Sequence, residues 1–186
     1  MSTYCREIAG HYASIWSTAP VERRWSRGPV AELPASFCVL EFPPTAERPS
    51  WTYATRCMSE PADEFRLELH LFSPVQAQEL VELLTVVAHF HRTGSRLALG
   101  HTVNFGRPWL PGSTCEYGLI SLPYLDGPEL ENLRTRDGGR DVHFLWLIPI
   151  TQAERDFKKA NGLEALEERF DDPPLDYLNP TRPSVA

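Results

Sequence analysis

The strongest hydrophobic pattern in the chain is the apolar run at residues 142–150, with the sequence VHFLWLIPI. It is too short to cross a bilayer and is typical of a strand buried on both faces of a sheet. Pro149 lies near the end of the run, where a missing backbone N–H costs least. We therefore predict a central strand at 142–150. Its two faces should bury Phe144, Trp146 and Ile148 on one side, and Leu145 and Leu147 on the other.

Two short helices are predicted directly after this strand. Thr151 and Glu154 have the spacing of a capping box, in which each side chain bonds to the backbone N–H of the other residue. Asn161 and Gly162 tolerate a left-handed backbone and can end the first helix. Residues 152–170 should therefore fold back over the sheet. Apolar residues give each helix one inward side: Ala153, Phe157 and Ala160 in the first, and Leu163, Leu166 and Phe170 in the second.

The segment 64–72 alternates between apolar and polar residues, which is the pattern of a half-buried strand. We predict a strand at 65–72 whose apolar side chains face the core. Arg66, Glu68 and His70 should face the other way. Runs rich in β-branched and aromatic residues predict three more strands, at 37–42, 51–58 and 117–122.

Two further helices follow from the same reasoning. Ser73 is a good N-cap and Pro74 a good first helical residue, and apolar residues then recur at helical spacing until Gly94. This pattern predicts a helix at 74–92. A shorter amphipathic helix is predicted at 3–17, with one apolar side formed by Ile8, Tyr12, Ile15 and Trp16.

These elements predict a protein of the α/β (α+β) class, with a mixed, largely antiparallel sheet flanked by helices. A chain of 186 residues is the size of one domain, and no repeat or linker divides it. We expect a single domain at 1–186 that ends in an extended tail at about 171–186. Residues 22–29, which include Arg23, Arg24, Trp25 and Arg27, should form a turn-rich basic loop.

Charge and composition narrow the possible partners. The net charge of −7 argues against nucleic acid as a partner, because phosphate contacts need clustered Lys and Arg, and it suits a basic protein partner. No apolar run reaches transmembrane length, so no membrane partner is expected. The residues after Met1 do not resemble a signal peptide, which predicts a cytoplasmic protein. In that compartment the four cysteines, Cys5, Cys38, Cys57 and Cys115, should be reduced, buried thiols.

The motifs of common enzymes are missing from the sequence. It contains no nucleophile elbow, phosphate loop or dinucleotide fingerprint, so no cofactor and no catalytic residue is predicted. His89 and His91 point in different directions on a helix, and His101 with Cys115 gives only two ligands, so no metal site is predicted either. The carboxylates of Glu164, Glu167 and Glu168 should form the solvent face of the last helix, or an acidic patch for a basic partner.

Several short motifs resemble one known family. The segment FLWLIPIT-x-x-E, followed by NG-x-x-x-L-E-x-x-F, is similar to the carboxy-terminal signature of the Suppressor of fused domain family. R-x-E-L, G-H-T-V, G-x-P-W and the terminal P-T-R-P-S-V are similar to the family as well. W-x-Y-x-T-x-x-M-S also resembles it, except that Cys57 stands where the family usually has glycine. The resemblance extends from about the second strand to the end.

The resemblance implies a non-catalytic protein-binding domain. Bacterial members of the family are associated with toxin–immunity systems, and animal members bind a transcription-factor peptide, so we expect a bacterial immunity or accessory protein that binds a toxin domain. The peptide groove of the animal members has an acidic residue at the position of His101 and an aromatic one at that of Phe90. The candidate partner-binding residues are Phe90, His101, Thr102, Asn104, Phe105 and Trp109. The alternative is a small metal-dependent or hydrolytic enzyme with an unfamiliar site.

Overall fold

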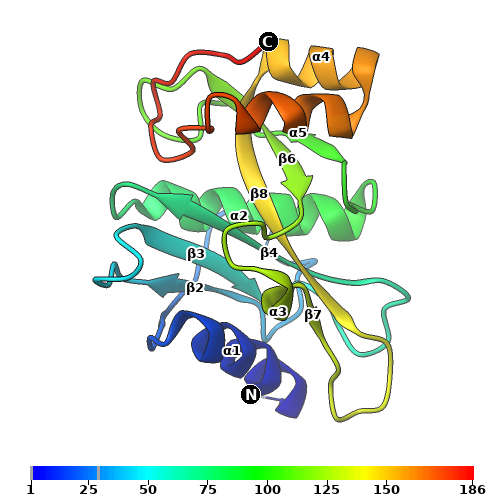
Figure 1. Ribbon diagram of the computed structural model, residues 1–186. Helices are drawn as coiled ribbons and strands as arrows, with labels where there is room; N and C mark the ends of the chain where they lie inside the picture. Colours follow the sequence, from blue (N-terminus) through cyan, green and yellow to red (C-terminus); the bar gives the residue numbers. More distant parts are fainter. Residues whose placement is uncertain (1, 29) are drawn as a thin grey trace.

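The structure is a computed structural model that describes residues 2–28 and 30–186. The amino-terminal helix α1 and the carboxy-terminal helices α4 and α5 lie at opposite ends of a twisted sheet, and α2 crosses the sheet between them (Figure 1). The helices are α1 (Thr3–Trp16), α2 (Gln78–Thr93), α3 (Pro128–Glu131), α4 (Gln152–Asn161) and α5 (Leu163–Asp171). The strands are β1 (Val21–Arg23), β2 (Cys38–Phe42), β3 (Trp51–Arg56), β4 (Arg66–Ser73), β5 (Thr102–Asn104), β6 (Cys115–Ser121), β7 (Asn132–Leu133) and β8 (Val142–Thr151).

The sheet is mixed and mostly antiparallel, which confirms the predicted class. Its strand order is β1-β2-β3-β4-β8-β6-β5, and β7 pairs with one end of β8. Within the described residues, the pairing of β4 with β8 is parallel and the other pairings are antiparallel. The apolar run predicted as a central strand is β8, which lies between β4 and β6.

Alternating residues of β8 separate the two sides of the core, as predicted. Leu145 and Leu147 pack with the apolar side of α2. Phe144 packs with α1 on the opposite face of the sheet, and Trp146 and Ile148 pack further along that face with α5. One helix therefore covers the first face, whereas α1 and α5 share the second.

The strand predicted at 65–72 is present as β4, but the prediction that it is half-buried is wrong, because α1 covers its polar side. All eight residues of β4 are buried. Glu68 accepts hydrogen bonds from Thr55 Oγ1 at 2.6 Å and from Ser59 N at 3.2 Å. His70 lies 3.4 Å from the carboxylate of Asp126. The polar residues at alternate positions of this strand are therefore buried and contact other polar groups of the domain, so they do not face water.

Two predicted details of the helices also need correction. The long helix begins at Gln78 rather than at Pro74, because Ser73 is the last residue of β4 and its hydroxyl accepts from Val75 N at 3.3 Å within a turn. The capping box of Thr151 and Glu154 is present. In α4, however, Ala153 and Ala160 are exposed, and the one buried residue is Glu154.

Glu154 is buried because it holds the carboxy-terminal segment. Residues 172–186 contain no named helix or strand and pack along α5 and β8 through Leu175, Tyr177, Leu178 and Val185. Arg182 donates to Glu154 Oε1 at 2.5 Å and to Oε2 at 2.8 Å, and both side chains are buried. The tail is therefore a packed part of the fold.

The prediction of four reduced cysteines is wrong for two of them. Cys5 and Cys57 form a disulfide that joins α1 to the end of β3, whereas Cys38 and Cys115 are free and buried. Cys57 has a left-handed backbone with φ 61°. This is the position at which the resembling motif usually has glycine, so the turn keeps the conformation that glycine favours although a cysteine occupies it.

Three short strands and one short helix were not predicted. Val21–Arg23 forms the edge strand β1 where a loop was expected, while Trp25 packs on the core, and Pro29 lies outside the described residues. The strands β5 and β7 and the helix α3 have two to four residues each, so they are too short to show a period in the sequence.

Candidate functional site

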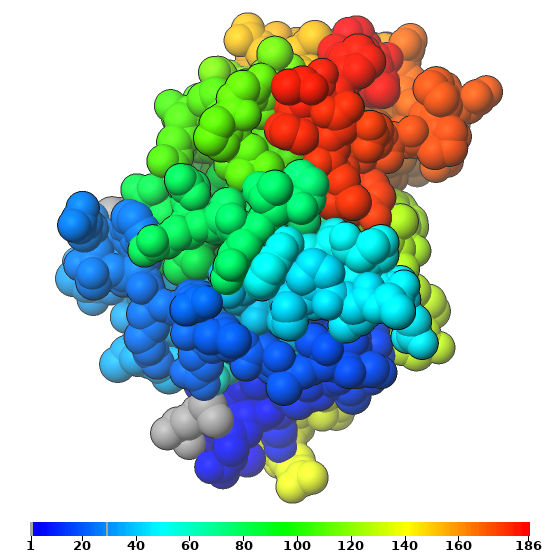
Figure 2. Space-filling view, turned by 90° about the vertical axis from the view of Figure 1, so that its left-hand side faces the viewer, coloured from blue at the N-terminus to red at the C-terminus, as the bar shows by residue number. Residues whose placement is uncertain are grey.

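A groove of about 420 Å³ runs between α2 and β5 at one edge of the sheet. It contains four of the six predicted partner-binding residues, Phe90, Thr102, Asn104 and Phe105. Its other lining residues are Glu82, Leu83, Val86, Val87, Val103, Gly106 and Arg107. Figure 2 shows the surface of α2 next to the segment that follows β5.

One wall of the groove is a row of side chains on α2. Glu82, Val86 and Phe90 are each four residues apart, so they lie along one side of the helix. Val86 and Phe90 are both 39 % exposed, which is unusual for large apolar side chains on a helix that otherwise buries its apolar side. The row therefore offers apolar contact area that the domain itself does not cover.

The other wall is the free edge of the sheet. Among the described strands, β5 pairs with β6 alone. The carbonyl of His101 accepts from Ile120 N at 2.9 Å, and Phe105 N donates to Glu116 O at 2.9 Å, so the odd-numbered residues turn their backbone groups toward β6. The N–H and C=O groups of Thr102 and Asn104 consequently point away from β6. They are the groups through which a further strand would pair.

A glycine makes room for the aromatic residue at the end of this strand. A Cβ atom added to Gly118 of β6 would lie 2.6 Å from Cζ of Phe105 and 2.6 Å from Cδ1 of Leu147. The ring of Phe105 thus lies directly over the backbone of β6, half-buried against the core. It forms part of the floor of the groove and is not a free surface anchor.

An ion pair closes one end of the groove. Arg107 donates to the carboxylate of Glu82 at 2.6 Å, and both side chains are partly exposed. Asn104 is fixed nearby, because its side-chain oxygen accepts from Gly106 N at 2.7 Å. The groove therefore combines an apolar centre, unpaired backbone groups along one side and a charged end.

The remaining two predicted site residues lie elsewhere. His101 is exposed but does not line the groove. Trp109 is 2 % exposed and belongs to the core around α2, so the structure places it inside the domain instead of at a contact surface.

The residues that shape the groove and that sequence reasoning did not assign to the site include Glu82, Val86, Arg107 and Gly118. Val86 and Phe90 are apolar residues outside the predicted apolar stripe of α2. Such additional apolar positions were the sequence signal that could have indicated a binding surface. The roles of Arg107 and Gly118 depend on contacts between segments that are distant in sequence.

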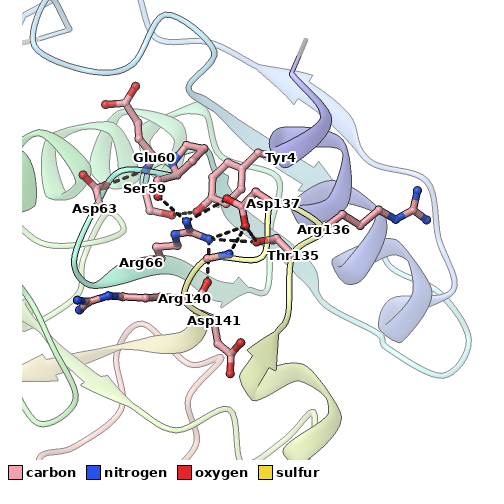
Figure 3. A network of polar contacts seen from close by, with 12 residues as sticks. Tyr4, Ser59, Glu60, Asp63, Arg66, Thr135, Arg136, Asp137, Arg140 and Asp141 are labelled. Carbon is pink, nitrogen blue, oxygen red and sulfur yellow. Dashed lines mark hydrogen bonds and ion pairs between the residues drawn. The ribbon is translucent and has the colours of Figure 1, made fainter.

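Two polar clusters outside the groove make contacts within the domain. Figure 3 shows the guanidinium of Arg66 between Thr135, Asp137 and the backbone of Arg140, to which it donates at 3.0, 3.3 and 2.7 Å. It also forms an ion pair with Asp137 at 2.9 Å. Hydrogen bonds that Thr135 Oγ1 and Gly139 N donate to Asp137, together with this ion pair, lower the pKa of Asp137 to about 2. This network fastens the loop before β8 to β4.

The buried pair of His70 and Asp126 has the same structural character. Burial raises the pKa of Asp126, but His70 and Arg48 outweigh this effect and lower it to about 2. Trp16 Nε1 also donates to Asp126 at 2.8 Å, so the carboxylate links α1 to the loop after β6. In both clusters the charged side chains are paired within the domain.

Within the described part of the chain, no group of three or more His, Cys, Asp or Glu side chains is placed to hold a metal ion. No helix among these residues has both the length and the apolar character needed to cross a membrane.

Comparisons with known proteins point to one family. The sequence profile of the family described as Suppressor of fused protein (SUFU) matches residues 34–183. The crystal structure of a SUFU homolog from Neisseria gonorrhoeae FA 1090 is 34 % identical, with a TM-score of 0.84, over 98 % of this chain and 97 % of that one. No curated protein sequence is significantly similar to the chain.

Two more distant structures share the fold. The structure described as the Sufu-Fu complex has a TM-score of 0.71 at 14 % identity, over 98 % of this chain and 92 % of that one. Drosophila Suppressor of Fused has a TM-score of 0.69 at 14 % identity, over 98 % of this chain and 51 % of that one.

Proposed function

Because the chain belongs to the Suppressor of fused family, we propose that it is a non-catalytic protein-binding domain whose groove between α2 and β5 takes an extended segment of a partner protein. The observation that carries the proposal is the free edge of β5 beside the exposed apolar row of α2. A partner strand that pairs with Thr102 and Asn104 gains backbone hydrogen bonds from the edge. Its alternate side chains contact Val86 and Phe90.

The chemistry of the groove favours binding over catalysis. Its lining holds one carboxylate, Glu82, which is paired with Arg107, and it holds no histidine, cysteine or lysine. A partner segment with an apolar side chain at every second position fits this surface, because successive side chains of a strand point in opposite directions.

We also propose that the partner is a toxin domain and that this chain acts as its immunity or accessory protein. The bacterial homolog among the similar structures and the net charge of −7, which suits a basic partner, support this assignment. The cytoplasm is the proposed site of action. The Cys5–Cys57 disulfide weighs against that compartment, because disulfides are rare in reducing environments. Thiol trapping in lysed cells followed by mass spectrometry would determine the state of this pair.

The groove can be tested without knowledge of the partner. A phage library of random dodecapeptides is panned on the wild type and on the double variant Val86→Ser with Phe90→Ser. The matched control is Val21→Ser with Val75→Ser, which changes two exposed valines outside the groove (47 % and 51 % exposed). We expect peptides with alternating apolar residues to be enriched on the wild type and the control, and to be lost on V86S/F90S.

A second variant addresses the sheet edge. Thr102→Pro removes an outward N–H and leaves the bonds between β5 and β6 in place, since proline is tolerated on edge strands. Enriched peptides should bind this variant at least tenfold more weakly while its Tm stays close to that of the wild type. Peptides that bind V86S/F90S and T102P as tightly as the wild type would show that the groove is not the site.

The toxin assignment has its own test. Co-expression with any toxin domain that is encoded beside the gene should protect cells, and the two proteins should co-purify. Toxicity that co-expression does not reduce would refute the immunity role while leaving the groove proposal intact.

A further inference from the structure

A second groove lies at the carboxy-terminal end of the molecule and shares no residue with the first. It has a volume of about 560 Å³ and lies between α5, the loop after β6 and the carboxy-terminal segment. Trp146 and Ile148 of β8 contribute to its apolar wall, together with Phe170, Leu175 and Tyr177. Tyr124 and Leu125, which are 59 % and 52 % exposed, also line it.

The charges at this groove all have one sign. Glu164, Glu167, Glu168 and Asp171 of α5 line it, and none of its lining residues is basic. Glu167 is held in place, because it accepts from Ser121 Oγ at 2.5 Å and from Tyr124 OH at 3.3 Å. Glu164, Glu168 and Asp171 are exposed, and no hydrogen bond or ion pair to their side chains is found among the described residues.

Two arginines close to the groove already have partners within the domain. The guanidinium of Arg48 lies over the rings of Trp16 and Phe72, at 4.9 and 5.3 Å from their centroids, and it pairs with Asp126. Arg169 of α5 lies over the ring of Phe157 and donates to Val185 O at 3.0 Å. Neither guanidinium is therefore paired with the carboxylates of α5.

One buried donor in the groove wall also lacks a partner. Trp146 is 5 % exposed, and its indole N–H has no acceptor among the described residues. Buried indole N–H groups normally find an acceptor, so this one calls for an explanation.

We propose that this groove is a second docking site, and that its occupant is a basic segment of a partner protein with a large apolar side chain flanked by Lys or Arg. The apolar side chain enters between Trp146, Phe170 and Tyr177, and the flanking cations meet the carboxylates of α5. Charge complementarity selects this occupant, because an anionic or purely polar segment would bring like charge or unpaired polar groups to an acidic, apolar surface. The inference does not depend on the groove beside β5.

The test measures binding of a fluorescein-labelled peptide, Lys-Lys-Leu-Phe-Lys-Lys, by fluorescence anisotropy in low salt. Two further peptides replace either the central pair by Ser-Ser or the four lysines by glutamates. Saturable binding of the first peptide, and binding at least tenfold weaker for each of the others, is the expected result. Equal affinity for the Ser-Ser peptide would show a diffuse charge effect only and would overturn the proposal.

Amino-acid substitutions test whether the peptide binds in this groove. Glu164→Lys with Glu168→Lys reverses two exposed charges at the groove and should weaken binding about tenfold or more. The matched control is Glu32→Lys with Glu64→Lys, which makes the same change in net charge at exposed residues outside the groove and should alter the Kd less than twofold. Leu125→Ser, at an exposed position, should weaken binding without a change in Tm.

Three further outcomes would contradict the inference: no saturable binding to the wild type, equal affinity for the wild type and E164K/E168K, or binding abolished by V86S/F90S. The last result would place the peptide in the other groove. Light scattering on the protein alone gives a fourth readout. A dimer that E164K/E168K dissociates would identify a second copy of this chain as the occupant and would refute the proposed partner.

Discussion

The ring nitrogen Nδ1 of His91 accepts a hydrogen bond from the backbone N–H of Leu97 at 2.9 Å. This bond joins the last turn of α2 to the segment that leads into β5, and both residues are buried. Nδ1 can accept only when it carries no proton, so the folded state requires neutral His91 with its proton on Nε2. The contact helps to hold the segment before β5 against α2, next to the first groove.

The first prediction concerns pH. Burial lowers the pKa of His91 from 6.5 to about 4. Between these values the unfolded chain binds a proton that the folded protein does not, so stability falls as the pH drops from about 6.5 toward 4, by up to about 3 kcal/mol. His91→Asn keeps an acceptor for Leu97 and cannot titrate. The free energy of unfolding of the wild type relative to H91N should fall across this window.

The comparison with H91N is needed because the titration of Glu68 changes the stability of the protein with pH in the opposite direction. Burial raises the pKa of Glu68 to about 7, so its contribution to stability grows as the pH falls from 7 to 4.5. Urea melts of both proteins at several pH values cancel this shared contribution. A constant difference from pH 7 to pH 4 would show that His91 does not titrate as stated.

The second prediction concerns Gly118. Gly118→Ala places a methyl group against Phe105 and Leu147 and should destabilise the protein by about 1–3 kcal/mol, the range for overpacking. Displacement of Phe105 should also weaken peptides bound in the groove beside β5. Gly10→Ala is the control, because no atom lies within 4 Å of the added carbon and alanine favours the helix α1. It should stabilise by about 0.5–1 kcal/mol and leave peptide binding unchanged.

The third prediction concerns the buried ion pair of Arg182 and Glu154. Burial raises the pKa of Glu154, but Arg182 and nearby backbone N–H groups outweigh this effect and lower it below its ordinary value. Arg182→Met leaves a buried carboxylate without its partner and should cost about 3–5 kcal/mol in chemical denaturation. The exposed pair of Arg134 and Asp141 provides the contrast, since Asp141→Asn should cost less than about 1 kcal/mol. Similar losses for both variants would mean that the tail is not anchored by Arg182.

The fourth prediction concerns the disulfide. Cys5 and Cys57 are 52 residues apart, and loss of a crosslink over such a loop costs about 4 kcal/mol in the chain-entropy description. C5S/C57S should therefore melt well below the wild type, and the wild type should lose the same stability in reductant. C5S/C57G should recover about 1 kcal/mol, because glycine adopts the left-handed backbone of residue 57 without strain. Thiol titration of the denatured wild type should find two free thiols, and four would exclude the crosslink.

The sequence by itself determined the elements with a strong local signal. The apolar run of β8, the alternation of β4 and the capping box of Thr151 and Glu154 depend on residues that are neighbours along the chain, so local sequence patterns identified them. The spaced motifs around these elements gave the family, which the sequence profile and the homolog structure confirm. Four of the six site residues that the family resemblance indicated lie in one groove.

The tertiary structure alone decided features that arise from contacts between distant segments. Whether Glu68 and His70 face water depended on the packing of α1 across β4, and that packing involves residues more than fifty positions away. The burial of Trp109 and of Arg182, and the pairing of Cys5 with Cys57, depend in the same way on which surfaces meet. A local pattern fixes which side of a strand or helix is apolar, but only the assembled fold determines what covers each side.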